Sequence, residues 1–405
     1  MFSTMSSYIY YPAIVPLARD LGVTVLLLNL TMTSYLVMAA IAPAFMGDLA
    51  DQTGRRPIYI LMFTLLICAN IGIAMQNSFP ALLVLRMVQA TGASGLNAVA
   101  YGVISDVTVA KERGGYVGIL LLFTDFAVSS HFLTMLLFFP ETQRNIVGNG
   151  TGKATGVYRS LFPLFQKKEV KKQQIPMSKP ARHYPNPFSC LPILAHVESL
   201  KVITLYALTY AVKMTVQTSL GAQCVEAYTL SYLSAGLIYL PSGVAGVLGA
   251  FLTGQVLNRT YKGTVARLSD GREVECNIDS DEFPLGRTRL MGMDFLLSVS
   301  ALGTLGYGLI LMRKAVLTGF TTASIFAVTG TLLTDLNMHR SATAQGACSI
   351  VRGLGAAGAI ALMEPIAHAM GLGWCFALYA VLMLVQLPLV WMLRRREQRR
   401  SNLGS

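Results

Sequence analysis

The sequence predicts an all-α membrane protein of about eleven spans, arranged in two pseudo-symmetric helical halves. Composition is the first indication, because 53% of the 405 residues are hydrophobic and 13% are charged. An ordinary soluble domain carries about 25% charged residues. The apolar residues also form long runs, and a helix needs roughly 20 of them to cross a bilayer. Finally, one short polar motif occurs twice, at matching places in the two halves.

A short apolar run opens the chain at about 7–18, and ten longer runs follow it. Glycine and proline occur inside many of these runs, which is typical of helices that are embedded in lipid. Five runs precede a polar segment at residues 140–200 and six follow it. The longer runs fall at about 24–46, 58–76, 81–109, 115–139, 202–221, 228–256, 293–312, 315–336, 344–367 and 373–393.

The net charge of +12 is concentrated in two segments. Residues 141–200 hold nine Lys or Arg and three Glu, and residues 394–400 hold five Arg and one Glu. Basic segments beside membrane spans favour the cytoplasmic side, so this charge indicates membrane topology rather than nucleic-acid binding. We therefore expect an incomplete N-terminal half at 1–139, a basic cytoplasmic linker at 140–200, a C-terminal half at 201–393 and a basic cytoplasmic tail at 394–405.

Enzymes and metal proteins find no support in the sequence. The six cysteines are scattered, with no CxxC pair and no Cys/His pairing, so neither a zinc site nor a disulfide framework is indicated. The motifs HExxH and GxSxG and a phosphate-binding loop are also missing from the sequence, as is a GxGxxG dinucleotide fingerprint with its acidic partner. We expect no enzymatic activity, no cofactor and no metal.

The repeated motif reads G-x-x-x-[D/N]-x-T-x-[R/K]. It begins at Gly47, in the segment GDLADQTGRRP, and again at Gly254, in the segment GQVLNRTYK, 207 residues later. In each half the motif follows the second apolar run. Weak internal symmetry of this kind is typical of transporters with duplicated halves.

These segments resemble the major facilitator superfamily over nearly the whole chain. GDLADQTGRRP resembles the signature loop of the family, and LRMVQATGA at 85–93 resembles the R-x-x-Q-G element of span 4 in its drug:proton antiporters. The resemblance is greatest to the fungal twelve-span branch, which includes multidrug and organic-acid exporters. Further matching segments are YYPA at 10–13, FPETQR at 139–144, GLIYLP at 236–241, LLTDL at 332–336, SATA at 341–344 and Val351-Arg352.

The resemblance implies a conformational latch at the signature loop, formed by Gly47, Asp51, Gly54, Arg55 and Arg56. Glycine allows tight turns and close helix approach, and the charges can pair with each other and with helix dipoles. The alternative is a basic loop that only sets topology.

The resemblance also ties Arg86 to proton coupling, with Gln89 three residues later on the same helix face. The alternative for Arg86 is a side chain that reaches the outer headgroups.

A candidate substrate cavity is indicated by one polar helix face in the run 202–221. Tyr206, Tyr210, Lys213 and Gln217 recur at i, i+4, i+7 and i+11, so they share a face. Aromatic rings, an amide and one cation suit an amphipathic or anionic organic substrate. A polar stripe that packs on a neighbouring helix is the alternative. Arg352, in a glycine- and alanine-rich run, is either part of this cavity or a helix-packing residue.

The interval 114–140 is too short for the expected topology. Lys111–Arg113 and the linker should both be cytoplasmic, so an even number of crossings must separate them. The apolar stretch 115–139 suffices for one crossing. Its start resembles the family's span 5 and its end span 6, without the Gly/Pro-rich antiporter element between them. We therefore expect a deletion of ~40–60 residues, at roughly 20 residues per span. Asp125 is then a by-product of the deletion, and a proton carrier is the alternative. Residues 1–17 likewise resemble only the outer part of span 1.

The leading functional hypothesis is a proton-coupled exporter of small amphipathic organic molecules, such as drugs, toxins or secondary metabolites. An organic-acid exporter of the citrate type is the alternative within transport, with Arg86, Lys213 and Arg352 as anion contacts. A transport-inactive membrane protein is the alternative from another class, because spans 1, 5 and 6 look incomplete. We expect a small-molecule substrate, protons and the lipid bilayer as partners, no nucleic acid, a monomer, and residence in the plasma membrane.

Overall fold

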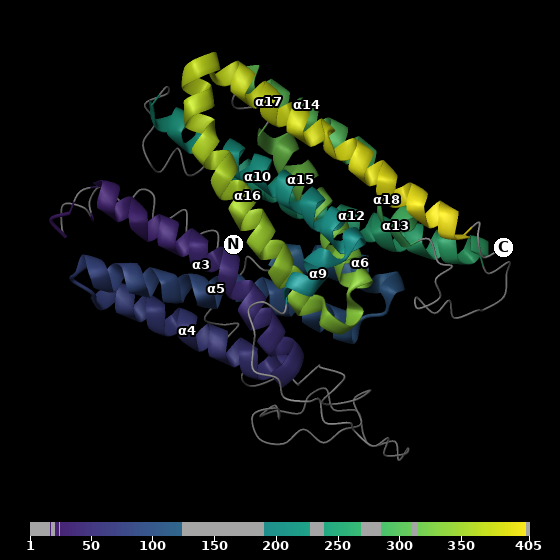
Figure 1. The fold of residues 1–405 in the computed structure, drawn as a ribbon, viewed down its shortest axis with the longest axis horizontal. Coiled ribbons are helices and arrows are strands. Elements are labelled where there is room, and N and C mark those ends of the chain that lie inside the picture. The colour runs from purple at the N-terminus through teal and green to yellow at the C-terminus, as the bar shows by residue number, and fades with distance from the viewer. Residues whose placement is uncertain are drawn as a thin grey trace, which may run out of the picture. The chain divides into compact units, whose positions relative to one another are not determined.

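A computed structural model describes residues 17, 21–23, 25–123, 190–226, 239–268, 285–309 and 315–401. Over these ranges the chain forms helices joined by short turns and contains no strand, which confirms the all-α class (Figure 1). The chain divides into two compact units, which we call unit 1 and unit 2. Unit 1 comprises Met1–Val107, Thr124–Leu194 and Asn337–Ile350, and unit 2 comprises Thr108–Phe123, Ala195–Leu336 and Val351–Ser405.

Unit 1 is built on three long helices. They are α3 (Val25–Thr53), α4 (Arg55–Met75) and α5 (Phe79–Val107). Helix α5 packs against both α3 and α4. Gly92 permits the α4–α5 contact, because a Cβ atom at this position would lie 2.7 Å from the carbonyl oxygen of Met62. The 3₁₀ turn η3 (Met338–Arg340) and the beginning of α16 (Ser341–Met370), up to Ile350, complete the described part of unit 1.

Unit 2 is built around α12, which packs on α15 and on α6. Helix α15 also contacts α10 and α14, and α14 packs on α17. The α12–α15 contact is close, since a Cβ atom at Gly249 would lie 2.5 Å from the carbonyl oxygen of Phe320. The helices of unit 2 are α6 (Ala110–Phe123), α10 (Val197–Glu226), α12 (Tyr239–Leu268), α13 (Leu285–Arg289), α14 (Met293–Leu309), α15 (Ala315–Leu336), α16 from Val351, α17 (Leu372–Leu384) and α18 (Gln386–Ser401). The short α9 (Leu191–Ala195) is divided along the chain, with its first four residues assigned to unit 1 and Ala195 to unit 2.

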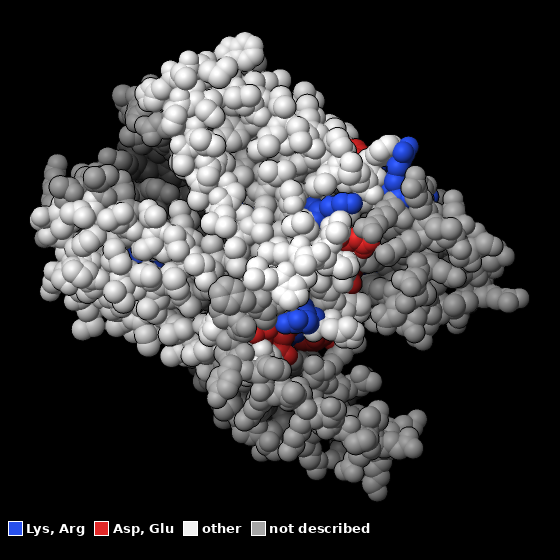
Figure 2. Space-filling view, viewed as in Figure 1, with Lys and Arg blue, Asp and Glu red and all other residues white. Residues whose placement is uncertain are grey.

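The described helices have the length and surface of membrane spans. Five segments within the described ranges are long and apolar enough to cross a bilayer, namely Thr33–Thr53, Arg55–Met75, Phe79–Val107, Met338–Met370 and Leu372–Arg395. Large apolar side chains lie at their surface, as at Trp374, which is 69% exposed. Figure 2 shows one face on which most of the described surface is uncharged. Such a surface suits contact with lipid.

The signature motif differs from the loop that the sequence suggests. Helix α3 continues to Thr53 and α4 begins at Arg55, so only Gly54 separates the two helices. Gly54 has a φ of 109°, a backbone conformation that side chains with a Cβ atom rarely adopt. A single glycine is therefore enough to reverse the chain. The second copy of the motif lies entirely within α12.

Several sequence-based expectations lie outside the described residues. The run 115–139 is described only to Phe123, at the end of α6, so Asp125 and the interval expected to carry the deletion are not covered. Most of the linker, the first run and residues 227–238 also fall outside. The division into two halves with a linker and a tail stays a prediction.

Candidate functional site

The signature residues of unit 1 form an ion-pair network between helix ends. Asp51, near the end of α3, accepts a hydrogen bond from Arg55 Nη1 at 2.5 Å. It also accepts from the backbone N–H and the hydroxyl of Thr343, at 2.8 and 2.5 Å. Arg55 Nε donates to Asp106 at the end of α5, at 2.9 Å. The side chain of Arg55 is 2% exposed, so these charge-assisted bonds are shielded from water.

Glycines bring the helices of this network close enough to interact. A Cβ atom at Gly47 would lie 2.5 Å from the carbonyl oxygen of Ala342, at the start of α16. We call the contact of Gly47 and Asp51 with Ala342 and Thr343 the α3–α16 crossing. A Cβ atom at Gly102 would lie 2.8 Å from the guanidinium carbon of Arg55, so Gly102 makes room for that side chain. Arg56, the second arginine of the motif, is buried at the start of α4.

Unit 2 contains an equivalent contact at the second copy of the motif. A Cβ atom at Gly254 would lie 2.6 Å from the carbonyl oxygen of Gly114, near the start of α6. Asn258, four residues after Gly254, accepts a hydrogen bond from the backbone N–H of Gly115 at 3.0 Å. We call this contact the α12–α6 crossing. The repeated glycine and the repeated acceptor thus make the same pair of contacts in each unit.

A second carboxylate network in unit 2 is centred on Asp335, at the end of α15. Arg113 of α6 donates to Asp335, and Arg289 of α13 donates to its other oxygen at 2.8 Å. All three side chains are fully buried. Arg289 Nη2 also donates to the carbonyl oxygen of Ala110 at 2.5 Å, and the guanidinium lies 4.8 Å from the centre of the Tyr261 ring. In the sequence, Asp335 belongs to the segment LLTDL at 332–336, and nothing there indicates a role in an ion-pair network.

Arg86 lies on α5 in a polar cluster inside unit 1. It is 2% exposed, and its Nη1 donates to Gln89 at 2.7 Å. Gln89 in turn donates to Asn70 of α4 at 2.6 Å. The guanidinium also lies 5.1 Å from the centre of the Tyr35 ring of α3. The structure therefore brings Arg86 and Gln89 together and adds Asn70 and Tyr35, which the sequence analysis did not select.

The candidate substrate residues of unit 2 gather around Phe326 of α15. The rings of Tyr206 and Phe326 are stacked with centroids 4.6 Å apart, and the Tyr210 ring is 6.0 Å from Phe326. Lys213 Nζ lies 5.2 Å from the centre of the Phe326 ring. The Arg352 guanidinium lies 5.8 Å from Tyr206 and 5.0 Å from Tyr210. We call these five residues the aromatic–cation cluster.

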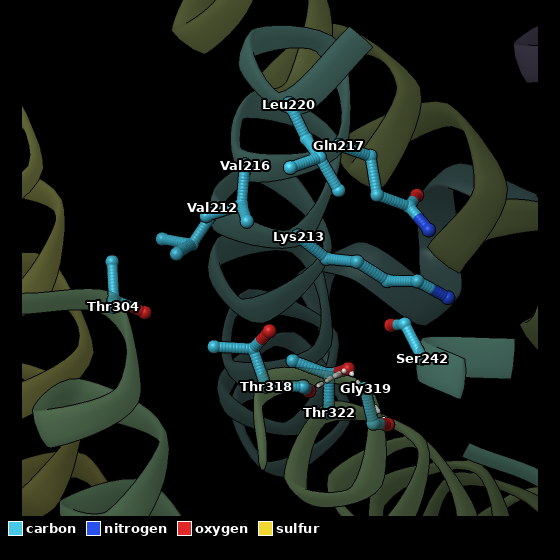
Figure 3. A pocket seen from close by; sticks show the side chains of 10 residues that line it. All are labelled: Val212, Lys213, Val216, Gln217, Leu220, Ser242, Thr304, Thr318, Gly319 and Thr322. Atoms are coloured by element: carbon cyan, nitrogen blue, oxygen red, sulfur yellow. Dashed lines mark hydrogen bonds between the residues drawn. The ribbon is translucent and has the colours of Figure 1, made fainter. Parts of the chain in front are cut away.

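A pocket adjoins this cluster at Lys213 (Figure 3). It is partly open to solvent. Figure 3 shows Lys213 and Gln217 extending from α10 to the same side, with Ser242 of α12 near the end of the lysine. The pocket is lined mainly by apolar and hydroxyl side chains, together with Lys213 and Gln217. The lining residues are Val212, Lys213, Val216, Gln217, Leu220, Ser242, Thr304, Thr318, Gly319 and Thr322.

One shared reason explains why the sequence did not predict the roles of Phe326, Asn70 and the arginines of the Asp335 network. Each belongs to a different helix from the residue it contacts, and several of these contacts join residues far apart in the chain, as with the 222 residues between Arg113 and Asp335. A single phenylalanine in an apolar run also resembles a lipid-facing residue. The available signal was the position of the charges, since Arg113, Arg289 and Asp335 all lie at helix ends.

Comparison with known proteins identifies the family. The sequence model of the Major Facilitator Superfamily matches residues 1–269. The MFS-type transporter phiL of a fungal species is 30% identical over 414 residues, which cover 90% of this chain and 98% of that protein. Citrate exporter 1 of Aspergillus niger is 28% identical over 435 residues, covering 96% and 82%. The human organic anion transporter MFSD10 shares the fold, with a TM-score of 0.60 at 14% identity, covering 94% and 88%.

The relatives also differ from this chain in length. The MFS-type transporter phiD of the same fungal species is 30% identical over 432 positions, and the chain spans 65% of its length. The alignment covers 96% of the 405 residues, about 389, so at least about 43 of the 432 aligned positions stand opposite gaps in this chain. The family model and the phiL relative together show that this chain is a multi-pass membrane protein that belongs to the Major Facilitator Superfamily, a family of transporters rather than enzymes.

Proposed function

We propose that the chain is a proton-coupled exporter of small amphipathic organic molecules. The observation that supports it most is the buried cluster of Arg86, Gln89, Asn70 and Tyr35, which lies on the span 4 element that resembles the drug:proton antiporters. A buried ionised arginine inside a span is costly and is commonly functional. Arginine stays charged at physiological pH, so Arg86 itself does not carry the proton. A fixed positive charge favours the ionised state of an acid or anion that comes close to it, and in this proposal that effect links protonation to conformation.

The α3–α16 crossing supports the transport mechanism within this proposal. Asp51, Arg55 and Asp106 join the ends of three helices of unit 1 to the start of α16. Contacts of this kind hold one conformation of a transporter and must break for another to form. We propose that the signature residues act as such a latch during alternating access.

Export of an organic acid is the second candidate for the substrate. Two observations favour it. Lys213 and Arg352 belong to one aromatic–cation cluster, and a relative at 28% identity is a citrate exporter. Cations inside a membrane bundle commonly contact anionic substrates. Organic-acid export would use the same fold as drug export, and the two proposals differ in the charge of the substrate.

We further propose that gaps of the alignment fall in the interval 114–140 and that the chain in its present form transports weakly. At least about 43 positions of the phiD relative have no counterpart here, which is close to the ~40–60 residues expected from the missing parts of two spans. A form restored between residues 110 and 145 with the equivalent segment of a relative should therefore export better. Without the missing parts of spans 5 and 6, the first half of the bundle would have an open groove where these spans should cover it.

Paired expression in a drug-sensitive host tests this proposal. Efflux of a fluorescent drug is measured for the chain as written and for the restored form, at matched membrane abundance, with and without a protonophore. We expect efflux from the restored form that the protonophore abolishes, and at most weak efflux from the chain as written. If the restored form shows no efflux of any tested compound, the exporter assignment is wrong. Equal efflux from both forms would show that the shorter interval has no functional effect.

A further inference from the structure

We propose that the aromatic–cation cluster of unit 2 binds the carboxylate of an amphipathic aromatic acid. This inference rests on the proposed transport function and names the substrate class. The cluster is formed by Tyr206, Tyr210, Lys213, Phe326 and Arg352, and it adjoins the pocket at Lys213. One ligand could therefore contact the two cations of the cluster with one end and the uncharged side chains of the pocket with the other.

The charges of the cluster call for an anion. Within the described part of the chain no ion pair involves Lys213, although it is partly buried in α10. A second cation, Arg352, belongs to the same cluster, over the rings of Tyr206 and Tyr210. Two neighbouring cations in a low-dielectric bundle repel each other, and a bound anion converts that repulsion into two attractions. A neutral or cationic ligand lacks this charge–charge attraction.

Both cations lie over aromatic rings, at 5.0–5.8 Å from the ring centres. A guanidinium that lies over an aromatic ring uses its face, and its N–H groups point outward in the plane of the guanidinium. These N–H groups match the two oxygens of a carboxylate. Lys213 can reach the same carboxylate as a point charge with three rotatable donors. The three rings then lie beside the bound group and exclude water from it.

The rings and the pocket favour an apolar body on that carboxylate. Tyr206, Tyr210 and Phe326 present aromatic surface to a ligand, and aromatic pairs are favourable at centroid separations of 4.5–7 Å. Val212, Val216 and Leu220 add aliphatic surface in the pocket. The hydroxyls of Ser242, Thr318 and Thr322 provide a few polar contacts, as is common in small-molecule sites. A small, highly charged acid such as citrate would leave most of this apolar surface unused.

Binding to the purified 405-residue chain tests the inference without requiring transport. The probes are 2-naphthoate, its neutral isostere 2-naphthamide, and citrate, and the readout is equilibrium dialysis in detergent. We expect 2-naphthoate to bind at least about tenfold more tightly than 2-naphthamide and more tightly than citrate. Lys213→Met should reduce the preference for the acid over the amide to less than about twofold. Dialysis of the same detergent without protein corrects for uptake of the probes by detergent.

Two further variants separate charge from folding. Lys213→Arg keeps the positive charge and should keep most of the preference for the acid. Lys201→Met, the same substitution nearer the start of α10 and outside the cluster, should leave it unchanged. The inference is overturned if the amide binds as tightly as the acid, if Lys213→Met retains the preference, if citrate binds most tightly, or if the folded chain binds none of the probes. Drug efflux by the restored form would leave the exporter proposal intact in every one of these cases.

Discussion

The α3–α16 crossing of unit 1 and the α12–α6 crossing of unit 2 are built from equivalent residues but differ in charge. Gly47 and Gly254 each face a backbone carbonyl near the start of the partner helix. Four residues later, Asp51 and Asn258 each accept a backbone N–H from the next residue of that partner helix. The acceptor is a carboxylate in unit 1 and an amide in unit 2.

The charge of the acceptor decides which further hydrogen bonds and ion pairs it can make. Asp51 also accepts hydrogen bonds from Arg55 and from the Thr343 hydroxyl. In unit 2 the arginine at the end of the short helix α13, Arg289, pairs with Asp335 and not with Asn258. The glycine and the N–H acceptor are thus the shared structural requirement, whereas the ionic contacts are distributed differently in each unit.

The largest effect on stability is expected for Asp335→Asn. This change leaves Arg113 and Arg289, both fully buried, without their shared negative charge. Removing one partner of a buried ion pair costs about 3–5 kcal/mol. The midpoint of thermal unfolding in detergent should fall clearly. Asp294→Asn is the matched control, because Asp294 is half exposed in its pair with Arg394, and it should cost about 1 kcal/mol or less. Equal effects of the two changes would contradict the buried network.

Gly47→Ala and Gly254→Ala should each destabilise the chain by about 1–3 kcal/mol, because the added methyl group would meet a backbone carbonyl that side-chain rotation cannot move. Gly263→Ala in α12 is the control, since nothing lies within 4 Å of a Cβ atom there. Thermal unfolding of the three variants measures the difference. The equivalence of the two crossings fails if only one of the first two variants is destabilised.

A smaller effect is expected from exchanging the acceptors. Asp51→Asn keeps an acceptor for the Thr343 N–H but loses the ionic contribution from Arg55, at a cost of about 1–2 kcal/mol. Asn258→Asp places a carboxylate where the described contact is only the Gly115 N–H, and should change stability by less than about 1 kcal/mol. Unfolding of both variants at low and high salt separates the two cases. A larger loss for Asn258→Asp would reverse the proposed difference between the crossings.

The parts of the molecule that depend on composition and local spacing could be predicted from the sequence. Apolar runs predict the helices, and the repeated G-x-x-x-[D/N] predicts where Gly47 and Gly254 lie. The four-residue periodicity of Tyr206 and Tyr210 predicts their shared face. Contacts between distant segments could not be predicted, because residues such as Thr343 have ordinary local surroundings and gain their role only when α16 meets α3.

The charged residues at helix ends show a second limit. Arg113 lies in a segment that reads as a cytoplasmic loop, since Lys111 and Glu112 precede it. In the structure its side chain is fully buried against Asp335. A sequence shows that a charge is near the end of an apolar run, but not whether it faces water or a carboxylate from another helix. The same ambiguity applied to Arg86, which local sequence allowed to reach the headgroups.

Efflux by Arg86→Ala tests the coupling proposal most directly. The restored form is compared with its Arg86→Ala variant and with an Arg395→Ala control, whose arginine is exposed in α18. Efflux of a fluorescent drug is measured with and without a protonophore, at matched membrane abundance. We expect Arg86→Ala to lower proton-driven efflux at least about tenfold, because the buried cation that biases protonation is lost, while insertion and the control stay unchanged. Normal proton-driven efflux from the Arg86→Ala variant would contradict a role for Arg86 in coupling.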